Sequence, residues 1–319
     1  MSLDQPMTIE CIACQGAASK IGEVPYAYHF LQHQLSKPLD SGDLYECSVC
    51  GLWFKYRFLP QEKLARFYIE SPDTLSWDNG EKRSDFEAAV SEILKTLPEG
   101  GSVLDFGCYK GGFLRLLPQQ FTRHGIEPSA AAAETASAHN IEVIGNDVTA
   151  LGNRQFDCIT VFDVFEHLIE PLKTLDALFD HIRPGGLLCV GTGFADFPAF
   201  HRSGAKYSYV CMPEHVCFLT ERFIAFLHNR YRSGYKTLPI LRIRPGMRAR
   251  LRIAAINCIN LPMLLLKSKK AIFRCYPTHR LRVITSRGLQ ASGSDHVFVV
   301  FWKPKSKFFP AKQEASLGD

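Results

Sequence analysis

The sequence predicts an α/β fold, a doubly wound and mostly parallel sheet preceded by a small metal-binding unit. Three observations predict it. Short apolar strands alternate with helical segments between about residues 100 and 190. A glycine-rich turn follows the first of these strands, and two closely spaced cysteine pairs lie near the N-terminus. A chain of 319 residues is long enough for one large core and a smaller appended unit.

The overall composition is that of an ordinary globular protein, with 46% hydrophobic and 22% charged residues. A net charge of +5 is too small to indicate a nucleic-acid partner, and we expect none. The first residues lack a basic stretch followed by an apolar core, which predicts a cytoplasmic protein without a signal peptide. The longest uncharged apolar run, 253–266, is shorter than the roughly 18 to 20 residues of a transmembrane helix.

The N-terminal cysteines form two pairs, Cys11-x-x-Cys14 and Cys47-x-x-Cys50. Two intervening residues let both thiolates of a pair reach one ion, and Gly51 permits a turn with positive φ after the second pair. Two such pairs complete a tetrahedral site, for which Zn²⁺ is the expected ion. Four thiolates leave no open position, so the zinc is expected to be structural. Four unrelated buried thiols are the alternative.

Two histidines between the cysteine pairs offer other ligands. His29 and His33 have i, i+4 spacing, which would place both on one face of a helix. Eleven cysteines without an export signal favour a metal site plus buried thiols over a disulfide framework. We therefore assign residues 1–75 to a zinc-binding domain.

The rest of the chain divides into a core, a C-terminal segment and a tail, at 76–235, 236–304 and 305–319. A helical period covers 83–97. The tail is polar and is expected to fray. The expected strands are 103–106, 124–127, 141–144, 156–162, 187–190 and 296–302, and the expected helices begin at 113, 129 and 171.

Four acidic residues lie at the ends of successive predicted strands: Asp105, Glu127, Asp147 and Asp163. Ligands of doubly wound sheets bind at the carboxyl ends of the strands, so this register predicts a binding site. A glycine loop alone also fits a nicotinamide enzyme. Here, however, an acid two residues before the first glycine would repel a pyrophosphate, whereas it suits the amino-acid part of a sulfonium cofactor.

The segment 103–193 resembles the core of class I S-adenosylmethionine-dependent methyltransferases, which have a Rossmann-like sheet. The matching pieces are Val103-Leu104-Asp105-x-Gly107-Cys108-x-x-Gly111, Gly125-Ile126-Glu127-Pro128-Ser129, Asp163-Val164-Phe165-Glu166-His167-Leu168 and Arg183-Pro184-Gly185-Gly186. Tyr109 replaces a usual glycine, so the loop around the methionine part is expected to differ. The cysteine pairs followed by Phe67-Tyr68 resemble the subgroup with an N-terminal zinc-binding domain, which includes sugar methyltransferases of natural-product and surface-glycan pathways.

The resemblance implies roles for residues of this chain. Asp105, Gly107 and Gly111 would line the methionine part of the cofactor, with Asp163 near the same end. Glu127 would bind the ribose hydroxyls, and Asp147 with Val148 would meet the edge of the adenine. The acceptor would be a small molecule, most plausibly a sugar or glycan precursor.

Methyl transfer to a hydroxyl requires an aligned acceptor and a base. His167, after the fourth strand of the core, and His215 are the candidates, and a structural histidine bonded to backbone is the alternative for each. Tyr207 and Tyr209 lie in an aromatic segment, 194–218, that we interpret as a loop covering the substrate. Their rings would suit a sugar or a planar group, or they simply pack.

Three other functions fit parts of the pattern. Asp163-x-x-Glu166-His167 with His215 resembles the divalent-metal site of small-RNA ribose methyltransferases. A methylation assay with EDTA, followed by Mg²⁺ or Mn²⁺, would distinguish this hypothesis from a metal-independent methyltransferase. A nicotinamide-dependent oxidoreductase would bind NAD rather than S-adenosylhomocysteine. A non-catalytic zinc-bearing adaptor would bind cofactor without turnover.

Basic residues flank the apolar run near the C-terminus, over 242–274. Such a segment fits peripheral contact with an anionic membrane. A helix packed on the core with solvated basic flanks is the favoured alternative, and liposome flotation would decide between them.

Overall fold

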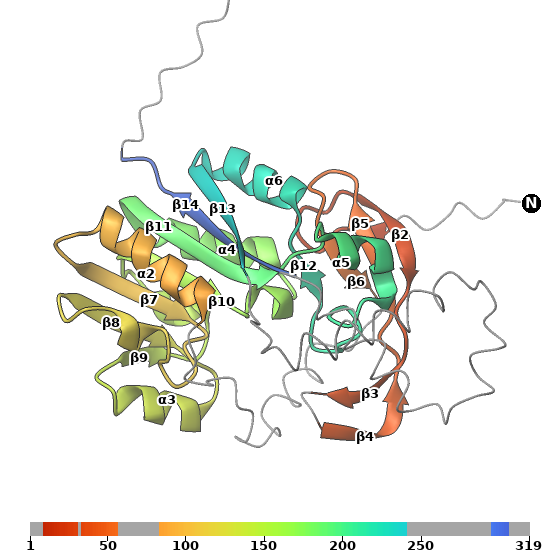
Figure 1. Ribbon diagram of the computed structural model, residues 1–319, viewed down its shortest axis with the longest axis horizontal. Coiled ribbons are helices and arrows are strands. Elements are labelled where there is room, and N and C mark those ends of the chain that lie inside the picture. The colour runs from red at the N-terminus through yellow and green to blue at the C-terminus, as the bar shows by residue number, and fades with distance from the viewer. Residues whose placement is uncertain (1–8, 31–32, 57–82, 241–294, 306–319) are drawn as a thin grey trace, which may run out of the picture.

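The computed structural model describes residues 9–30, 33–56, 83–240 and 295–305. A seven-stranded sheet and a five-stranded sheet lie side by side, and a two-stranded hairpin lies below the smaller sheet in the view of Figure 1. The seven-stranded sheet contains β7 (Gly101–Phe106), β8 (Phe121–Ile126), β9 (Glu142–Gly145), β10 (Phe156–Phe162), β11 (Ile182–Gly193), β13 (Gly234–Ile240) and β14 (His296–Trp302).

The strand order of the large sheet is β13-β14-β11-β10-β7-β8-β9. β7 to β11 pair in parallel, and only β14 runs antiparallel to both of its neighbours. The chain leaves β7 in one direction and returns to its other side with β10, so a topological switch point lies between these two strands. The prediction of a doubly wound, mostly parallel sheet is confirmed.

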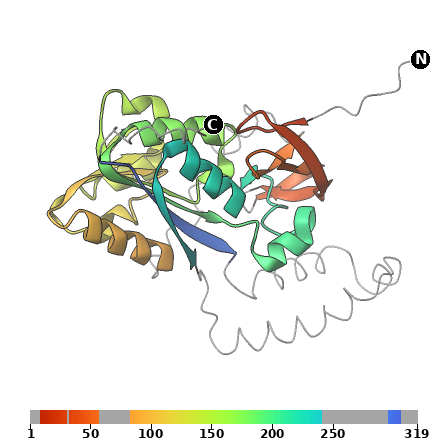
Figure 2. The same cartoon turned by 90° about the horizontal axis from the view of Figure 1, so that it is seen from above.

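Helices cover both faces of the large sheet, as the view from above shows (Figure 2). α2 (Ser84–Thr96) and α3 (Ala130–Ser137) pack on one face, and α4 (Pro171–Asp180) and α6 (Glu221–Tyr231) on the other. Alternate residues of one strand enter the two cores: Leu104 belongs to the core under α4 and α6, and Val103 to the core under α2. Apolar runs without polar alternation form these strands because both faces are buried.

The predicted helix from residue 113 is wrong. The structure has only a short 3₁₀ helix there, η1 (Leu114–Leu116), and the chain enters β8 five residues later. Pro118 disfavours helical backbone at the residue before it, and Leu117 is extended, with ψ of 140°. Consequently no α-helix N-terminus stands behind the glycine loop.

The five-stranded sheet contains β1 (Ile9–Glu10), β2 (Ala17–Glu23), β5 (Asp43–Cys47), β6 (Trp53–Tyr56) and β12 (Cys217–Phe218), in that order. β12 belongs to the later part of the chain and pairs antiparallel with β6. Segments about 160 residues apart in sequence therefore complete one sheet. A strand from the later part of the chain thus forms one edge of the sheet that carries the cysteines.

The expectation that His29 and His33 share a helix face is wrong. They lie on the hairpin of β3 (Ala27–Phe30) and β4 (His33–Leu39), where Phe30 pairs with His33. The remaining short helices are α5 (Pro198–Ser203), η2 (Val148–Leu151), η3 (Phe165–His167) and η4 (Gly204–Lys206). In the part of the chain that the structure describes, no helix is long and apolar enough to cross a membrane. The boundary near residue 75 and the basic segment 242–274 lie outside the described residues.

Candidate active site

Asp105 lies near the end of β7, at the switch point, and is buried among apolar neighbours. Its Oδ1 accepts a hydrogen bond from Thr160 Oγ1 on β10 at 2.6 Å. Burial raises the pKa of Asp105 to about 7, although the Thr160 hydroxyl and the charge of Arg83 act in the opposite direction. A carboxyl with this pKa exchanges its proton in the neutral range, where a nearby ammonium group would favour the ionised form.

The pKa of Asp105 predicts how the stability of the ligand-free protein depends on pH. An unfolded chain ionises this group near pH 3.8, so between about pH 4 and pH 7 the folded state alone holds the proton. Raising the pH across this window therefore removes stability. Asp105→Asn, which keeps an acceptor for Thr160, should melt increasingly above the wild type as the pH rises from 4 to 8.

Calorimetry at several pH values tests this expectation. Asp147→Asn is the contrasting variant, because hydrogen bonds from Thr149 lower the pKa of Asp147, so its carboxylate stabilises the fold at higher pH. A melting difference for Asp105→Asn that does not change with pH would contradict the assignment.

The glycine loop after β7 folds over the end of β8. The backbone N–H groups of Gly107 and Cys108 both donate to the carbonyl of Ile126. Gly107 has φ of 84°, and a Cβ there would lie 2.3 Å from Val164 Cγ2, so this position requires glycine. Tyr109 also has positive φ, 47°, and thus adopts the left-handed conformation that a glycine in its place would adopt readily. The loop keeps a glycine-like shape despite the tyrosine.

Glu127 directly follows β8 and holds this loop. Its Oε2 accepts from the N–H of Tyr109 at 2.8 Å, and its Oε1 from the N–H of Ser129 at 2.9 Å. Ser129 in turn caps α3. The carboxylate is buried at the carboxyl edge, as the sequence predicts. Each of its oxygens accepts from one such backbone donor.

The other two predicted acids lie at the same edge in different surroundings. Asp147 is exposed and caps η2 by accepting from the N–H of Thr149 at 2.8 Å, with Val148 half-buried beside it. Asp163 follows β10 with φ of 55° and forms an ion pair with Arg83 at 3.0 Å. Arg83 also pairs with Asp85 at 2.5 Å, so one guanidinium draws together two carboxylates.

The two predicted histidines meet beyond β10 and β11. The ring centroids of His167 and His215 are 4.9 Å apart, at an angle of 68°. Nδ1 of His167 donates to the carbonyl of Glu214 at 3.0 Å, and Nδ1 of His215 to that of Tyr209 at 2.9 Å. Because a carbonyl only accepts, each neutral ring has its proton on Nδ1 and its lone pair on Nε2.

His215 is the more deeply buried of the pair. Burial, followed by the nearby His167 and Lys55, lowers the pKa of His215 well below its ordinary value. The ring is therefore uncharged at neutral pH. In that state the ring has a lone pair on Nε2 with which it can accept a proton.

Buried contacts of Glu166 and Tyr209 lie next to these histidines. Glu166 is buried, and it accepts hydrogen bonds from Thr192 Oγ1 at 2.8 Å and from the hydroxyl of Tyr209. The ring of Tyr209 lies 4.0 Å from that of His215. The described residues include a group, Glu166 with His167 and His215, whose ligand-type atoms lie within 4.8 Å of one another.

The interpretation of 194–218 as a covering loop with open aromatic faces is wrong for its tyrosines. Tyr207 is fully buried, stacks on Phe200 with centroids 4.5 Å apart, and donates to Asp295 Oδ2. Tyr209 is 7% exposed. Both rings pack between the two sheets because this segment fills the junction that β12 creates.

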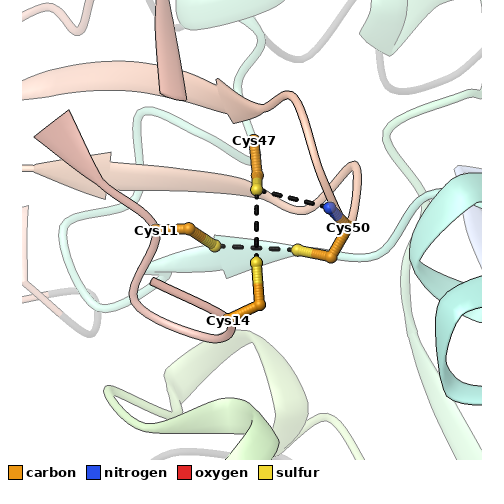
Figure 3. Close-up of side chains that lie close together, drawn as sticks. All are labelled: Cys11, Cys14, Cys47 and Cys50. Carbon is orange, nitrogen blue, oxygen red and sulfur yellow. Dashed lines mark hydrogen bonds between the residues drawn. The ribbon is translucent and has the colours of Figure 1, made fainter. Parts of the chain in front are cut away.

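The four N-terminal cysteines converge on one point (Figure 3). Sγ of Cys11 lies 3.7 Å from Sγ of Cys50, and Sγ of Cys14 lies 3.5 Å from that of Cys47. All four sulfurs lie within 4.8 Å of one another. Gly51 has φ of 77°, as its place after the second pair predicts, and a Cβ there would lie 2.3 Å from Arg222 Cβ on α6.

Three residues at the carboxyl edge of the large sheet were not identified as site residues from the sequence. Arg83 precedes α2 and pairs with Asp163. Asp295 and His296 begin β14, where His296 Nδ1 lies 2.7 Å from Asp295 Oδ1 and its ring faces Tyr209. A histidine at the start of an apolar strand and an arginine just before a helix are the signals that could have identified them.

Residues 79–231 match the family model described as a methyltransferase domain. This range includes the acid-bearing strand ends and both histidines. The family match and the relatives support an S-adenosylmethionine-dependent methyltransferase domain in this part of the chain.

Curated relatives bear methyltransferase names but differ in acceptor. The chain is 26% identical over 190 residues to a ubiquinone biosynthesis O-methyltransferase of Coxiella burnetii, covering 53% of this chain and 77% of the relative. It is 30% identical over 119 residues to a tRNA U34 carboxymethyltransferase of Desulfotalea psychrophila, covering 33% and 37%. The chain thus spans little more than a third of the length of that second relative. Among solved structures, the plantazolicin methyltransferase BpumL in complex with SAH is 17% identical, with a TM-score of 0.45 over 76% of this chain and 94% of that chain.

Proposed function

We propose that the chain transfers a methyl group from S-adenosylmethionine to a hydroxyl of a small molecule, with a histidine of the His167–His215 pair as the base. The observation that carries this proposal is the meeting of two imidazoles, each held by a hydrogen bond to a backbone carbonyl, at the edge of the sheet that holds the acids. The O-methyltransferase relatives support a hydroxyl acceptor.

The residues at the switch point have the chemistry that the cofactor needs. Bound S-adenosylmethionine supplies an electrophilic sulfonium methyl and leaves as S-adenosylhomocysteine. Asp105 and Glu127 offer carboxylates to the amino group and the ribose hydroxyls, respectively, and Arg83 offers a cation to the carboxylate of the methionine part. Asp147 and Val148 are proposed to meet the adenine, and Gly107, Gly111 and Asp163 to line the methionine end.

The proton of the acceptor is accounted for by the histidines. Nε2 of His215 or His167 takes the hydroxyl proton while the acceptor oxygen forms its new bond to carbon. Transfer of the methyl group to this oxygen would leave the electron pair of the broken bond on the sulfur of S-adenosylhomocysteine, so the histidine has only the proton to accept. The hydrogen bond from Nδ1 to a carbonyl holds each ring in place throughout and stabilises the imidazolium that forms.

The class of acceptor is tested by following label from S-[methyl-¹⁴C]adenosylmethionine. We propose a sugar or glycan precursor, supported by the resemblance of the cysteine-bearing front part. Nucleotide sugars and free sugars are compared with simple phenols in the same assay. Label in phenols alone would overturn the sugar assignment and keep methyl transfer.

Glu127 is proposed to bind the ribose, which predicts a loss of cofactor affinity in its variants. Removing a charged hydrogen-bond acceptor costs about 1.5–3 kcal/mol, so Glu127→Ala should weaken S-adenosylhomocysteine binding roughly 10- to 100-fold in titration calorimetry. Glu127→Gln keeps an oxygen for the Tyr109 N–H and should lose less. Glu134→Ala, on the exposed side of α3, is the matched control. Unchanged affinity in folded Glu127 variants would remove this role.

We also propose that the cysteine cluster holds structural zinc. A tetrahedral ion with Zn–S bonds of about 2.3 Å spaces its sulfurs about 3.8 Å apart, close to the separations of 3.5 and 3.7 Å within the two sulfur pairs. The hydrogen bond with Cys50 lowers the pKa of Cys11 to about 5 in spite of its burial, and the same contact raises the pKa of Cys50. Without an ion, this pair therefore holds one thiolate and one thiol, and metal binding displaces the remaining proton.

A second candidate is a metal-dependent RNA ribose methyltransferase, which the grouping of Glu166, His167 and His215 favours. Against it, Glu166 is already engaged by Thr192 and Tyr209, and Asp163 pairs with Arg83. Transfer that stops with EDTA and returns with Mg²⁺ or Mn²⁺, but not Zn²⁺, would establish this candidate.

A further inference from the structure

Lys55 is a charged residue in an otherwise uncharged strand, β6, and its side chain is fully buried. Burying an ammonium group is costly unless it is paired or hydrogen-bonded. The side chain lies between the five-stranded sheet and the segment that carries His215. Neither the cysteine cluster nor the methyl-transfer chemistry described above uses this lysine.

The contacts of Lys55 hold both ends of the turn that contains His215. Its Nζ donates to the carbonyl of Met212 at 2.7 Å. That same carbonyl accepts the N–H of His215 at 3.1 Å, which closes the turn. At the other end, the backbone N–H of Lys55 donates to the carbonyl of Val216 at 2.8 Å.

The hydrogen-bonded connection continues to the second histidine. The N–H of Val216 donates to the carbonyl of Glu166 at 2.6 Å, and Glu166 precedes His167 in η3. Val216 thus links β6 on one side to η3 on the other. Two backbone hydrogen bonds therefore connect Lys55, through Val216, to the segments that carry His215 and His167.

Charged and titratable groups face His215 from several elements. His167 faces it from η3, Lys55 from β6 and Asp163 from the loop after β10, and Glu214 precedes it in the turn. Burial lowers the pKa of Lys55 to about 7, against the opposing effects of Glu214 and Cys211. The cation on Lys55 disfavours a second positive charge on His215.

We propose that Lys55 is a positioning residue of the methyl-transfer site, which holds the turn from Met212 to Val216 and places a cation behind the His215 imidazole. The proposal rests on the function proposed above for His215. In this proposal, the sheet that carries the cysteines contributes to methyl transfer through Lys55 of β6.

The test compares Lys55→Met with Lys20→Met. Lys20 lies on β2 of the same sheet, and its side chain is partly exposed. Histidines labelled with ¹³C at Cε1 are titrated by NMR, and His215 is assigned by its absence in His215→Asn. We expect Lys55→Met to raise the pKa of His215 by about one unit and to slow methyl transfer about tenfold. Affinity for S-adenosylhomocysteine should stay within about twofold. Lys20→Met should change none of these.

A folded Lys55→Met protein that binds S-adenosylhomocysteine but leaves the titration of His215 unchanged would overturn the proposal. Should this variant fail to fold, ¹³C-labelled lysine in the otherwise intact protein gives a second test. One lysine Cε resonance should titrate near pH 7, and its midpoint should fall in Glu214→Gln, as expected for a lysine buried beside Glu214. Lysines that all titrate above pH 10 and do not respond to Glu214→Gln would contradict the burial of Lys55 against the His215 turn, on which the proposal depends. A shifted His215 together with full methyl transfer by His215→Asn would show that Lys55 acts on His215, but would reject His215 as the base and, with it, the role of Lys55 in methyl transfer.

Discussion

His215→Asn is expected to lower the rate of methyl transfer by about 10²- to 10⁴-fold, the usual contribution of a general base. Asparagine keeps a side-chain N–H in the place of Nδ1, so the hydrogen bond to the carbonyl of Tyr209 can persist while Nε2 is lost. The same argument applies to His167→Asn and the carbonyl of Glu214. The larger of the two losses identifies the base.

The measurement is transfer of labelled methyl, with S-adenosylhomocysteine affinity as the check that the cofactor site is intact. His139→Asn, at an exposed position after α3, serves as the matched control. The base must be uncharged, so activity is present above its pKa and is lost as the pH falls through it. Because the pKa of His215 is lowered, the acid limb should lie well below pH 6.5. Full turnover in both histidine variants would reject general-base catalysis by this pair.

Cys47→Ser is expected to abolish zinc binding and to lower the melting temperature by more than about 10 °C. Structural zinc contributes about 10–16 kcal/mol in isolated zinc-finger peptides, and even half of that is large for one domain. Cys47 is the last residue of β5 and fully buried, with its Sγ accepting the N–H of Cys50 at 3.4 Å. Loss of the ion should loosen the turn that Gly51 closes.

The effect should reach the methyl-transfer site, because the second cysteine turn docks on α6. Thr220 Oγ1 donates to the carbonyl of Gly51 at 2.9 Å, and Arg222 donates to the carbonyl of Ser48 at 2.7 Å. Metal content and calorimetry provide the measurement. Cys211→Ser, outside the cluster, should keep one zinc per chain and melt within a few degrees of the wild type. A wild-type protein that melts at the same temperature with and without bound zinc would show that the cluster holds no structural ion.

The part of the fold that depends on local pattern could be predicted. The strands around Asp105, Glu127 and Asp163 are short apolar runs buried on both faces, and these segments lie where the sequence predicts them. The helix expected from Phe113 failed because one proline outweighed an apolar pattern only five residues long. The prediction that the two hairpin histidines share a helix face failed because i, i+4 spacing does not show whether a helix forms.

By itself, the sequence determined the parallel strands β7 to β11, the placement of the four acids at their ends, and the grouping of the four N-terminal cysteines. These follow from periodicity and spacing, which act between neighbours in the chain. Only the tertiary structure decided that β12 completes the N-terminal sheet, that Tyr207 and Tyr209 pack inside, and that Lys55 lies behind His215. The contacts of β12 and of Lys55 join residues about 160 positions apart, and their energy comes from burial and hydrogen bonds that exist only once both sheets have formed.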